Sequence, residues 1–149
     1  MLPNLPIHPL LSLALVTTLT ILSLEARAHD ETKASASSAA QNTKIVPLLG
    51  KELASIPGKE GLMLTVEYAP GASSPPHRHD AHVFVYVLEG SIVMKTKGGQ
   101  EVTLSPGQTF YENPDDVHAV SKNASDTLPA KFLVFMVKEK GAAPVLPAQ

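Results

Sequence analysis

Three histidines stand close together at the start of an apolar segment, where their side chains could bind a metal ion. His77, His79 and His82 fall within six residues of a chain that has six histidines in all. Residues i and i+2 of an extended chain point to the same face, so His77 and His79 can each place a ring nitrogen about 2.1 Å from one cation. Neutral imidazole suits Mn, Fe, Zn, Ni or Cu, so the residue types predict one divalent transition metal without selecting it.

Two residues further along the chain could complete this site. His118 lies in the strand-like segment VHAVSKN, which follows the turn NPDD, and it is the expected third metal ligand. Glu112 comes six residues before His118 in the segment TFYE, so the two share strand parity. The carboxylate of Glu112 could reach the same cavity as an oxygen ligand or as a base. Glu112 is therefore the candidate catalytic residue.

The segments around these residues have the pattern of short β-strands. Over residues 44–140, apolar runs alternate with Gly, Pro, Asn and Asp, and no sustained 3.6-residue period occurs. Eight runs qualify: KIVPLLG, LMLTVEYAPG, HVFVYVLEG, SIVMKTKGG, QEVTLSPG, TFYENPDD, VHAVSKN and AKFLVFMVKE. The turn KGGQ is a hairpin signal, because successive glycines tolerate the positive φ of primed turns. The pattern predicts an all-β domain, an antiparallel sandwich or barrel of short strands.

The two ends of the chain differ from this central part. Residues 10–24 form an uncharged apolar run of 15 residues, shorter than the roughly 20 of a membrane span. Ala26-Arg27-Ala28 follows, which predicts a secretory signal peptide over residues 1–28 with cleavage after Ala28. An uncleaved anchor is the alternative, since no Lys or Arg precedes Leu10. Residues 29–43 are small and polar, and we expect a disordered linker there and a flexible tail over residues 141–149.

Composition narrows the class of partner. The formal net charge is −2, no run of Lys or Arg occurs, and Trp is absent, so nucleic acid and anionic membrane surfaces are poor partners. A length of 149 residues suits one folded domain. With no cysteine, the chain has neither disulfides nor a site for a lipid anchor. We expect a periplasmic or secreted protein that binds a small molecule and has no stable membrane insertion after cleavage.

With these motifs in this order, the sequence resembles the cupin superfamily over about residues 44–137. The first cupin motif has its counterpart in Gly71, His77, His79 and Gly90. Counterparts of the second motif are Pro106, Gly107, His118 and Asn123, while Asn113 and Asp115 stand where the family has its Pro and Gly. The resemblance implies a single-domain jelly roll of about eight strands that holds one metal inside its barrel, often as a homodimer.

This sequence departs from the cupin pattern at a residue that matters for chemistry. The glutamate of the family, which is often both metal ligand and proton-handling group, would fall at position 83, where the chain has Val83. His82 could substitute if a β-bulge at Asp80 and Ala81 turned it inward, because strict alternation points it away from the face of Val83. Glu112 could substitute from the neighbouring strand. A three-histidine site with open positions is the remaining possibility.

Two classes of function follow from this site. A metal-dependent oxidoreductase, similar to the dioxygenases among small cupins, would act on a carbonyl, enediol or aromatic compound, with Glu112 or His82 as the acid/base group. The alternative is a non-enzymatic module that binds a small ligand or the metal itself. The loss of the family's glutamate favours the non-enzymatic class. The two classes differ in the coordination of the metal, since four protein ligands indicate a structural site, whereas coordination positions open to water indicate catalysis.

Overall fold

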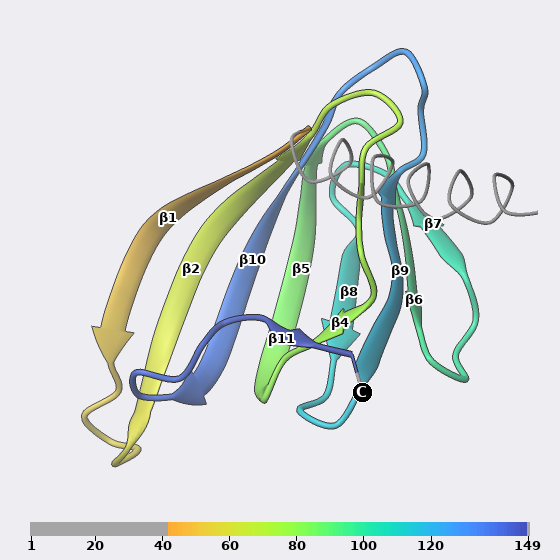
Figure 1. The fold of residues 1–149 in the computed structure, drawn as a ribbon. Coiled ribbons are helices and arrows are strands. Elements are labelled where there is room, and N and C mark those ends of the chain that lie inside the picture. Colours follow the sequence, from red (N-terminus) through yellow and green to blue (C-terminus); the bar gives the residue numbers. More distant parts are fainter. Residues whose placement is uncertain (1–41, 149) are drawn as a thin grey trace, which may run out of the picture.

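The computed structural model describes residues 42–148, which form two facing β-sheets (Figure 1). The expected signal peptide with its cut after Ala28, and the expected linker up to residue 41, lie outside the described residues. The first strand already begins at Thr43, where the linker was expected to end. Among the described residues, no helix has the length and apolar character needed to cross a membrane.

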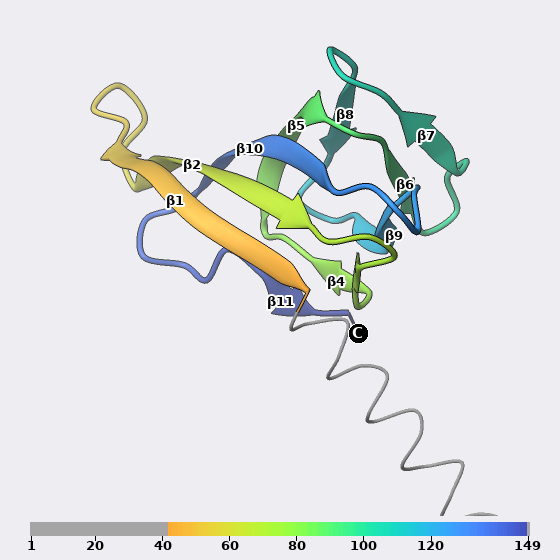
Figure 2. The same cartoon turned by 90° about the horizontal axis from the view of Figure 1, so that it is seen from above.

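Every strand pair of the two sheets is antiparallel. The first sheet has the order β1 (Thr43–Glu52), β2 (Lys59–Tyr68), β10 (Ala130–Glu139), β5 (Ala81–Glu89) and β8 (Thr109–Glu112). The second has the order β11 (Leu146–Pro147), β4 (His77–Arg78), β9 (Val117–Asn123), β6 (Ile92–Thr96) and β7 (Val102–Leu104), with β3 (Ser73–Ser74) beside β9. Figure 2 shows from above how β4, β9 and β6 face the first sheet across the interior. The all-β jelly-roll prediction is confirmed.

Alternation along the central strands builds the interior. On β5, Val83, Val85 and Val87 are buried, whereas Phe84 and Tyr86 between them are exposed. The inner face of β10 presents Phe132, Val134 and Met136, while the inner face of β2 presents Leu64 and Val66. Because side chains alternate between the two faces of a strand, the first sheet supplies an apolar wall to the interior.

All eight predicted runs are strands, and the structure adds three strands of two residues each. These are β3, β4 and β11, which are too short to show a period in the sequence. The tail over residues 141–149, which was expected to be flexible, contains a short strand in its described part, where Leu146 pairs with Arg78 and Pro147 with His77. Two prolines and the absence of periodicity suggested a loose end, but the partner of this segment lies far away in the sequence.

Gly90 closes the turn after β5 in a conformation that few other residues adopt. Its φ is 68°, and a Cβ at this position would lie 2.4 Å from the carbonyl oxygen of Pro129 and 2.8 Å from Cα of Ala130. Gly98 has a similar φ of 81°, but a Cβ there would meet nothing within 4 Å. A substitution at Gly98 therefore introduces backbone strain alone, whereas one at Gly90 introduces the same strain together with steric overlap.

We expect Gly98→Ala to lower the free energy of unfolding by about 1–2 kcal/mol, the cost of a left-handed L-residue. Gly90→Ala should cost at least about 3 kcal/mol, because overlap with backbone atoms that cannot move aside adds to the same strain. Urea unfolding of the two variants measures both values. Equal losses at the two positions would contradict the steric argument.

Candidate metal centre

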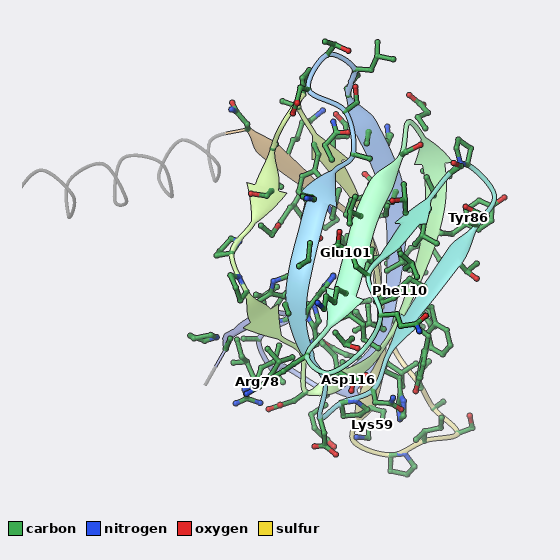
Figure 3. The ribbon with its side chains drawn as sticks, turned by 90° about the vertical axis from the view of Figure 1, so that its right-hand side faces the viewer. Lys59, Arg78, Tyr86, Glu101, Phe110 and Asp116 are labelled. Atoms are coloured by element: carbon green, nitrogen blue, oxygen red, sulfur yellow. The ribbon has the colours of Figure 1, made fainter. Side chains whose placement is uncertain are left out.

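The structure brings His77, His79 and His118 together. His77 on β4 is the direct cross-strand partner of His118 on β9, and His79 follows one residue after the end of β4. One ligand atom from each of the three lies within 4.8 Å of the others. His79 and His118 are buried and His77 is half-buried. Arg78 lies between His77 and His79 in the sequence, and Asp116 lies two residues before His118. Both labelled residues lie at the lower end of the barrel in Figure 3, so the histidines belong to that end.

Hydrogen bonds orient two of the three rings. Nδ1 of His77 donates to the carbonyl oxygen of Pro75 at 2.8 Å, and Nδ1 of His79 donates to the carbonyl oxygen of Pro144 at 2.5 Å. A carbonyl can only accept, so the proton sits on Nδ1 and each Nε2 keeps its lone pair. Metal-binding histidines commonly have this arrangement, in which the second nitrogen fixes the tautomer and the direction of the ring.

Two buried atoms at the site have no hydrogen-bond partner among the described residues. They are Nε2 of His118 and Oε2 of Glu112, in side chains that are only 4% and 2% exposed. An unsatisfied buried polar atom costs about 1–3 kcal/mol, and a buried carboxylate oxygen costs more. A cation bound by the three histidines would take up Nε2 of His118 and would stabilise the adjacent carboxylate electrostatically. Three imidazoles beside a carboxylate fit a divalent first-row metal, so the chemistry of the donors agrees with the lack of a partner at Nε2.

Glu112 enters the site from the strand next to β5. It is the cross-strand partner of Val83, so the two side chains share the inner face of the sheet. Its Oε1 lies 3.2 Å from Nδ1 of His118, and its Oε2 lies 4.0 Å from Nε2 of His79. The carboxylate therefore occupies the place beside position 83, where the resemblance expected a glutamate.

His82 lies outside the site, and its prediction as a metal ligand is wrong. The pairing of β5 with β10 runs without a break through Ala81, His82 and Val83, so no bulge turns His82 inward. Its exposed ring lies on the outer face of β5, with Nδ1 2.6 Å from the hydroxyl of Tyr111. Strict strand alternation thus decides between the two substitutes for the family's glutamate.

Electrostatics keep the first histidine neutral. Burial lowers the pKa of His77, and the neighbouring rings of His79 and His118 lower it further. The carbonyl of Pro75 and the carboxylate of Glu112 act in the opposite direction without reversing the shift. Because only neutral imidazole has a lone pair to offer, a lowered pKa favours cation binding at neutral pH.

A cavity of about 210 Å³ lies against the site. Its walls are mainly apolar side chains from β2, β5 and β10, and its lining includes Glu112 and the three histidines. Ile45 of β1 and Val145 of the C-terminal segment also line it while remaining 56% and 48% exposed, which places them at its opening.

A second polar group of the cavity was missed by the sequence analysis. The hydroxyl of Tyr68 lies 2.6 Å from Oγ of Ser74 and 2.8 Å from Oγ of Ser121, and all three residues line the cavity. Burial raises the pKa of Tyr68, so the phenol stays protonated. We call Tyr68, Ser74 and Ser121 the hydroxyl cluster.

The hydroxyl cluster depends on a bulge in β9. Residues three apart in a regular strand point to opposite faces, yet His118 and Ser121 are both buried and both line the cavity. Val120 and His118 pair with successive residues of β6, and Ala119 between them has no partner there. Ala119 is therefore an additional residue in β9, a bulge that puts the side chains of His118 and Ser121 on the same face. The segment VHAVSKN has no glycine or proline that would mark this irregularity in the sequence.

With this geometry in place, comparisons with known proteins identify the class. A family model described as "Cupin domain" matches residues 64–136. The chain belongs to the cupin superfamily. No curated protein matches the sequence.

Solved structures share the fold at low sequence identity. The polyketide cyclase RemF from Streptomyces resistomycificus is 23% identical with a TM-score of 0.56, covering 73% of this chain and 72% of that one. The protein TT1209 from Thermus thermophilus is 22% identical with a TM-score of 0.54, covering 66% and 85%. A cupin superfamily protein from Desulfitobacterium hafniense is 13% identical with a TM-score of 0.54, covering 65% and 78%. Identities at this level show a shared fold.

Proposed function

We propose that the chain is a small metalloenzyme that binds one divalent transition metal through His77, His79 and His118 and uses Glu112 as its acid/base group. One observation carries the proposal: Nε2 of His118 and Oε2 of Glu112 are buried beside an apolar cavity and have no hydrogen-bond partner within residues 42–148. A bound metal would supply Lewis-acid polarisation of a substrate oxygen and open positions for water, oxygen or substrate.

The residues of the chain have separate roles in this proposal. Glu112 is held through Oε1 at His118, while Oε2 stays available to accept a proton from the substrate and return it. The apolar walls exclude water, which strengthens each electrostatic interaction inside the cavity. The three O–H groups of the hydroxyl cluster are all used, two in the hydrogen bonds between its members and that of Ser121 in a hydrogen bond to Sδ of Met94 at 3.6 Å, so the cluster offers the substrate acceptor lone pairs.

The cavity limits the substrate by size and polarity. Its volume of about 210 Å³ is below the roughly 300–1,000 Å³ of sites for drug-sized ligands. The apolar walls from β2, β5 and β10 suit a hydrocarbon body. The metal suits oxygen atoms, and the hydroxyl cluster can accept a hydrogen bond from a hydroxyl group of the substrate. A small diketone, enediol or phenol has this distribution of groups, and we propose this class as the substrate.

The non-enzymatic alternative keeps the metal and dispenses with turnover. Val83 supports it, because the position that carries the glutamate in the family can neither bind a metal nor move a proton here. In that case the cavity would bind a small ligand next to the metal, and Glu112 would only orient His118.

One experiment tests both readings. The purified chain is stripped of metal, reloaded separately with Mn, Fe, Zn, Ni or Cu, and assayed for metal content, oxygen uptake and consumption of a panel of diketones, enediols and phenols. We expect one metal per chain and turnover with at least one metal, and no turnover in the chelator-treated sample. One bound metal without any turnover favours the non-enzymatic module. A chain that binds none of the metals contradicts both readings.

A further inference from the structure

The C-terminal segment crosses the mouth of the barrel. Residues 141–148, which we call the strap, run from the end of β10 to the short strand β4, in front of β5 in the view of Figure 1. We propose that the strap is a working part of the metal centre, which orients His79 and closes the cavity over the site. This inference rests on the proposed metal site and adds a segment that lies outside the residues matched by the cupin model, 64–136.

The first link is the contact with His79. This residue lies in the turn between β4 and β5, so the ladder of neither strand holds it. Its ring is buried, and the carbonyl oxygen of Pro144 accepts the hydrogen bond from Nδ1 at 2.5 Å. That bond directs Nε2 towards the other two histidines. Outer partners of this kind typically change metal affinity by about 10–100-fold when they are lost.

The second link is the pairing of β11 with β4. Pro147 lies opposite His77, and Leu146 lies opposite Arg78. The strap thus holds the backbone on one side of His77, while His118 of β9 pairs with it on the other. Two of the three predicted ligands therefore depend on the strap for their placement.

The third link anchors the beginning of the strap. Lys138 on the inner face of β10 has a side chain only 4% exposed. Its Nζ donates to the carbonyl oxygen of Ala142 at 2.5 Å and lies 2.5 Å from Oε1 of Glu60. A buried ammonium group requires such partners, because its desolvation is costly without them. Lys138 consequently fixes the start of the strap to β10 and β2, and β11 fixes its end.

Between these two anchors, the strap covers one side of the cavity. Pro144 and Val145 both line it, with Ile45 of β1 among the other residues at the opening. Removing the strap would expose the metal ligands to water and enlarge the entrance.

The test uses two variants and a matched control. One variant is a chain that ends at Lys140, and the other is Lys138→Met in the full chain, which keeps the side-chain volume but removes the anchor. Lys140→Met is the control: this lysine follows two residues later, its side chain is 57% exposed, and it pairs with Glu52 at 2.6 Å instead of contacting the strap. Metal affinity is measured by competition with a chromophoric chelator, with Zn²⁺ and Ni²⁺ as probes. Thermal unfolding of the metal-free chains identifies any variant that has failed to fold.

A second readout does not need the metal. Nitrogen-15 NMR of the metal-free chain reports which ring nitrogen of His79 carries the proton. We expect the Nδ1–H tautomer with a slowly exchanging proton in the full chain and in Lys140→Met, and loss of this signal in the truncated chain. We also expect metal affinity to fall about 10–100-fold in the truncated chain and in Lys138→Met, and to stay within about twofold in the control.

The outcomes separate this inference from the proposed function. If the full chain binds metal and both strap variants bind it equally well, the strap has no role in the site and the inference is wrong. If the full chain binds no metal, the proposed function and the role of the strap in metal binding fail together. The His79 tautomer then decides whether the strap still orders this side chain. A truncated chain that does not fold leaves Lys138→Met, with its full sequence, to decide the question.

Discussion

Replacing His118 with alanine is expected to lower metal affinity by more than about 100-fold, because loss of a ligand exceeds the 10–100-fold effect of losing an outer partner. The physical reason is that His118 joins the two halves of the site. It pairs with His77 across β4 and β9, and its Nε2 is the buried nitrogen that has no other partner. Two histidines alone leave a chelate from β4 and the residue that follows it, which competes poorly with water for the cation.

Thermal unfolding with and without added metal provides the measurement. A metal present at 100 times its Kd stabilises the folded chain by about 2.7 kcal/mol, and the His118→Ala chain should show none of this gain. His82→Ala is the matched control, since this ring lies exposed on the outer face of β5, and it should keep the full shift. If His118→Ala retained the metal-dependent shift, the ion would be bound elsewhere and the proposed site would be wrong.

Replacing Glu112 with glutamine is expected to reduce turnover by about 10²–10⁴-fold, the usual contribution of a positioned acid/base group. Glutamine has the same shape and can still contact His118, but it cannot accept a proton. The three histidines remain, so the metal should stay bound. Rates are compared with Glu101→Gln, which removes an exposed carboxylate and should leave turnover unchanged.

Stability should change in the opposite direction from activity at this position. A carboxylate that is 2% exposed, with Oε2 unpartnered, is costly in the metal-free chain. Burial of an ion costs several kcal/mol in proteins, whereas its replacement by leucine leaves only the Nδ1–H of His118 without an acceptor, which costs about 1–3 kcal/mol. Glu112→Leu should therefore unfold at equal or higher urea concentration without metal and should be inactive with it. A clear loss of metal-free stability would indicate that the carboxylate has a structural role instead.

The cross-strand register offers a sharper version of the same test. Because Val83 and Glu112 are direct partners on the inner face, the double variant Val83→Glu/Glu112→Val moves the carboxylate to the strand where the cupin pattern has it. We expect this exchange to recover part of the turnover lost in Glu112→Val alone. If the double variant binds metal but recovers no turnover, the strand that carries the carboxylate matters as well as the face of the sheet on which it lies.

Local patterns were enough to predict most of the fold. The runs between turn residues are rich in β-branched, aromatic and other apolar side chains, so all eight of the longer strands could be located, from the three residues of β7 to the ten of β10. The spacing of His77 and His79 predicted a shared direction because it depends only on the geometry of an extended chain. The strand-like segment VHAVSKN pointed to His118 as the third ligand, the cupin motifs agreed with it, and the structure places it opposite His77.

Other features depend on which strands become neighbours. The choice between His82 and Glu112 required the register of β5 against β8 and β10, and the shared face of His118 and Ser121 required the bulge at Ala119. The strap looked unstructured because its partners, His79, Arg78 and Lys138, come from other strands and turns.

The sequence by itself determined where the eight longer strands are and which residues are able to bind a metal, since both depend on side-chain chemistry and on local pattern. Only the tertiary structure decided which carboxylate enters the cavity, what orients His79 and how the opening is covered. The reason is that backbone pairing between distant segments leaves no periodic trace in either segment alone, so its register becomes visible only when both strands are in place.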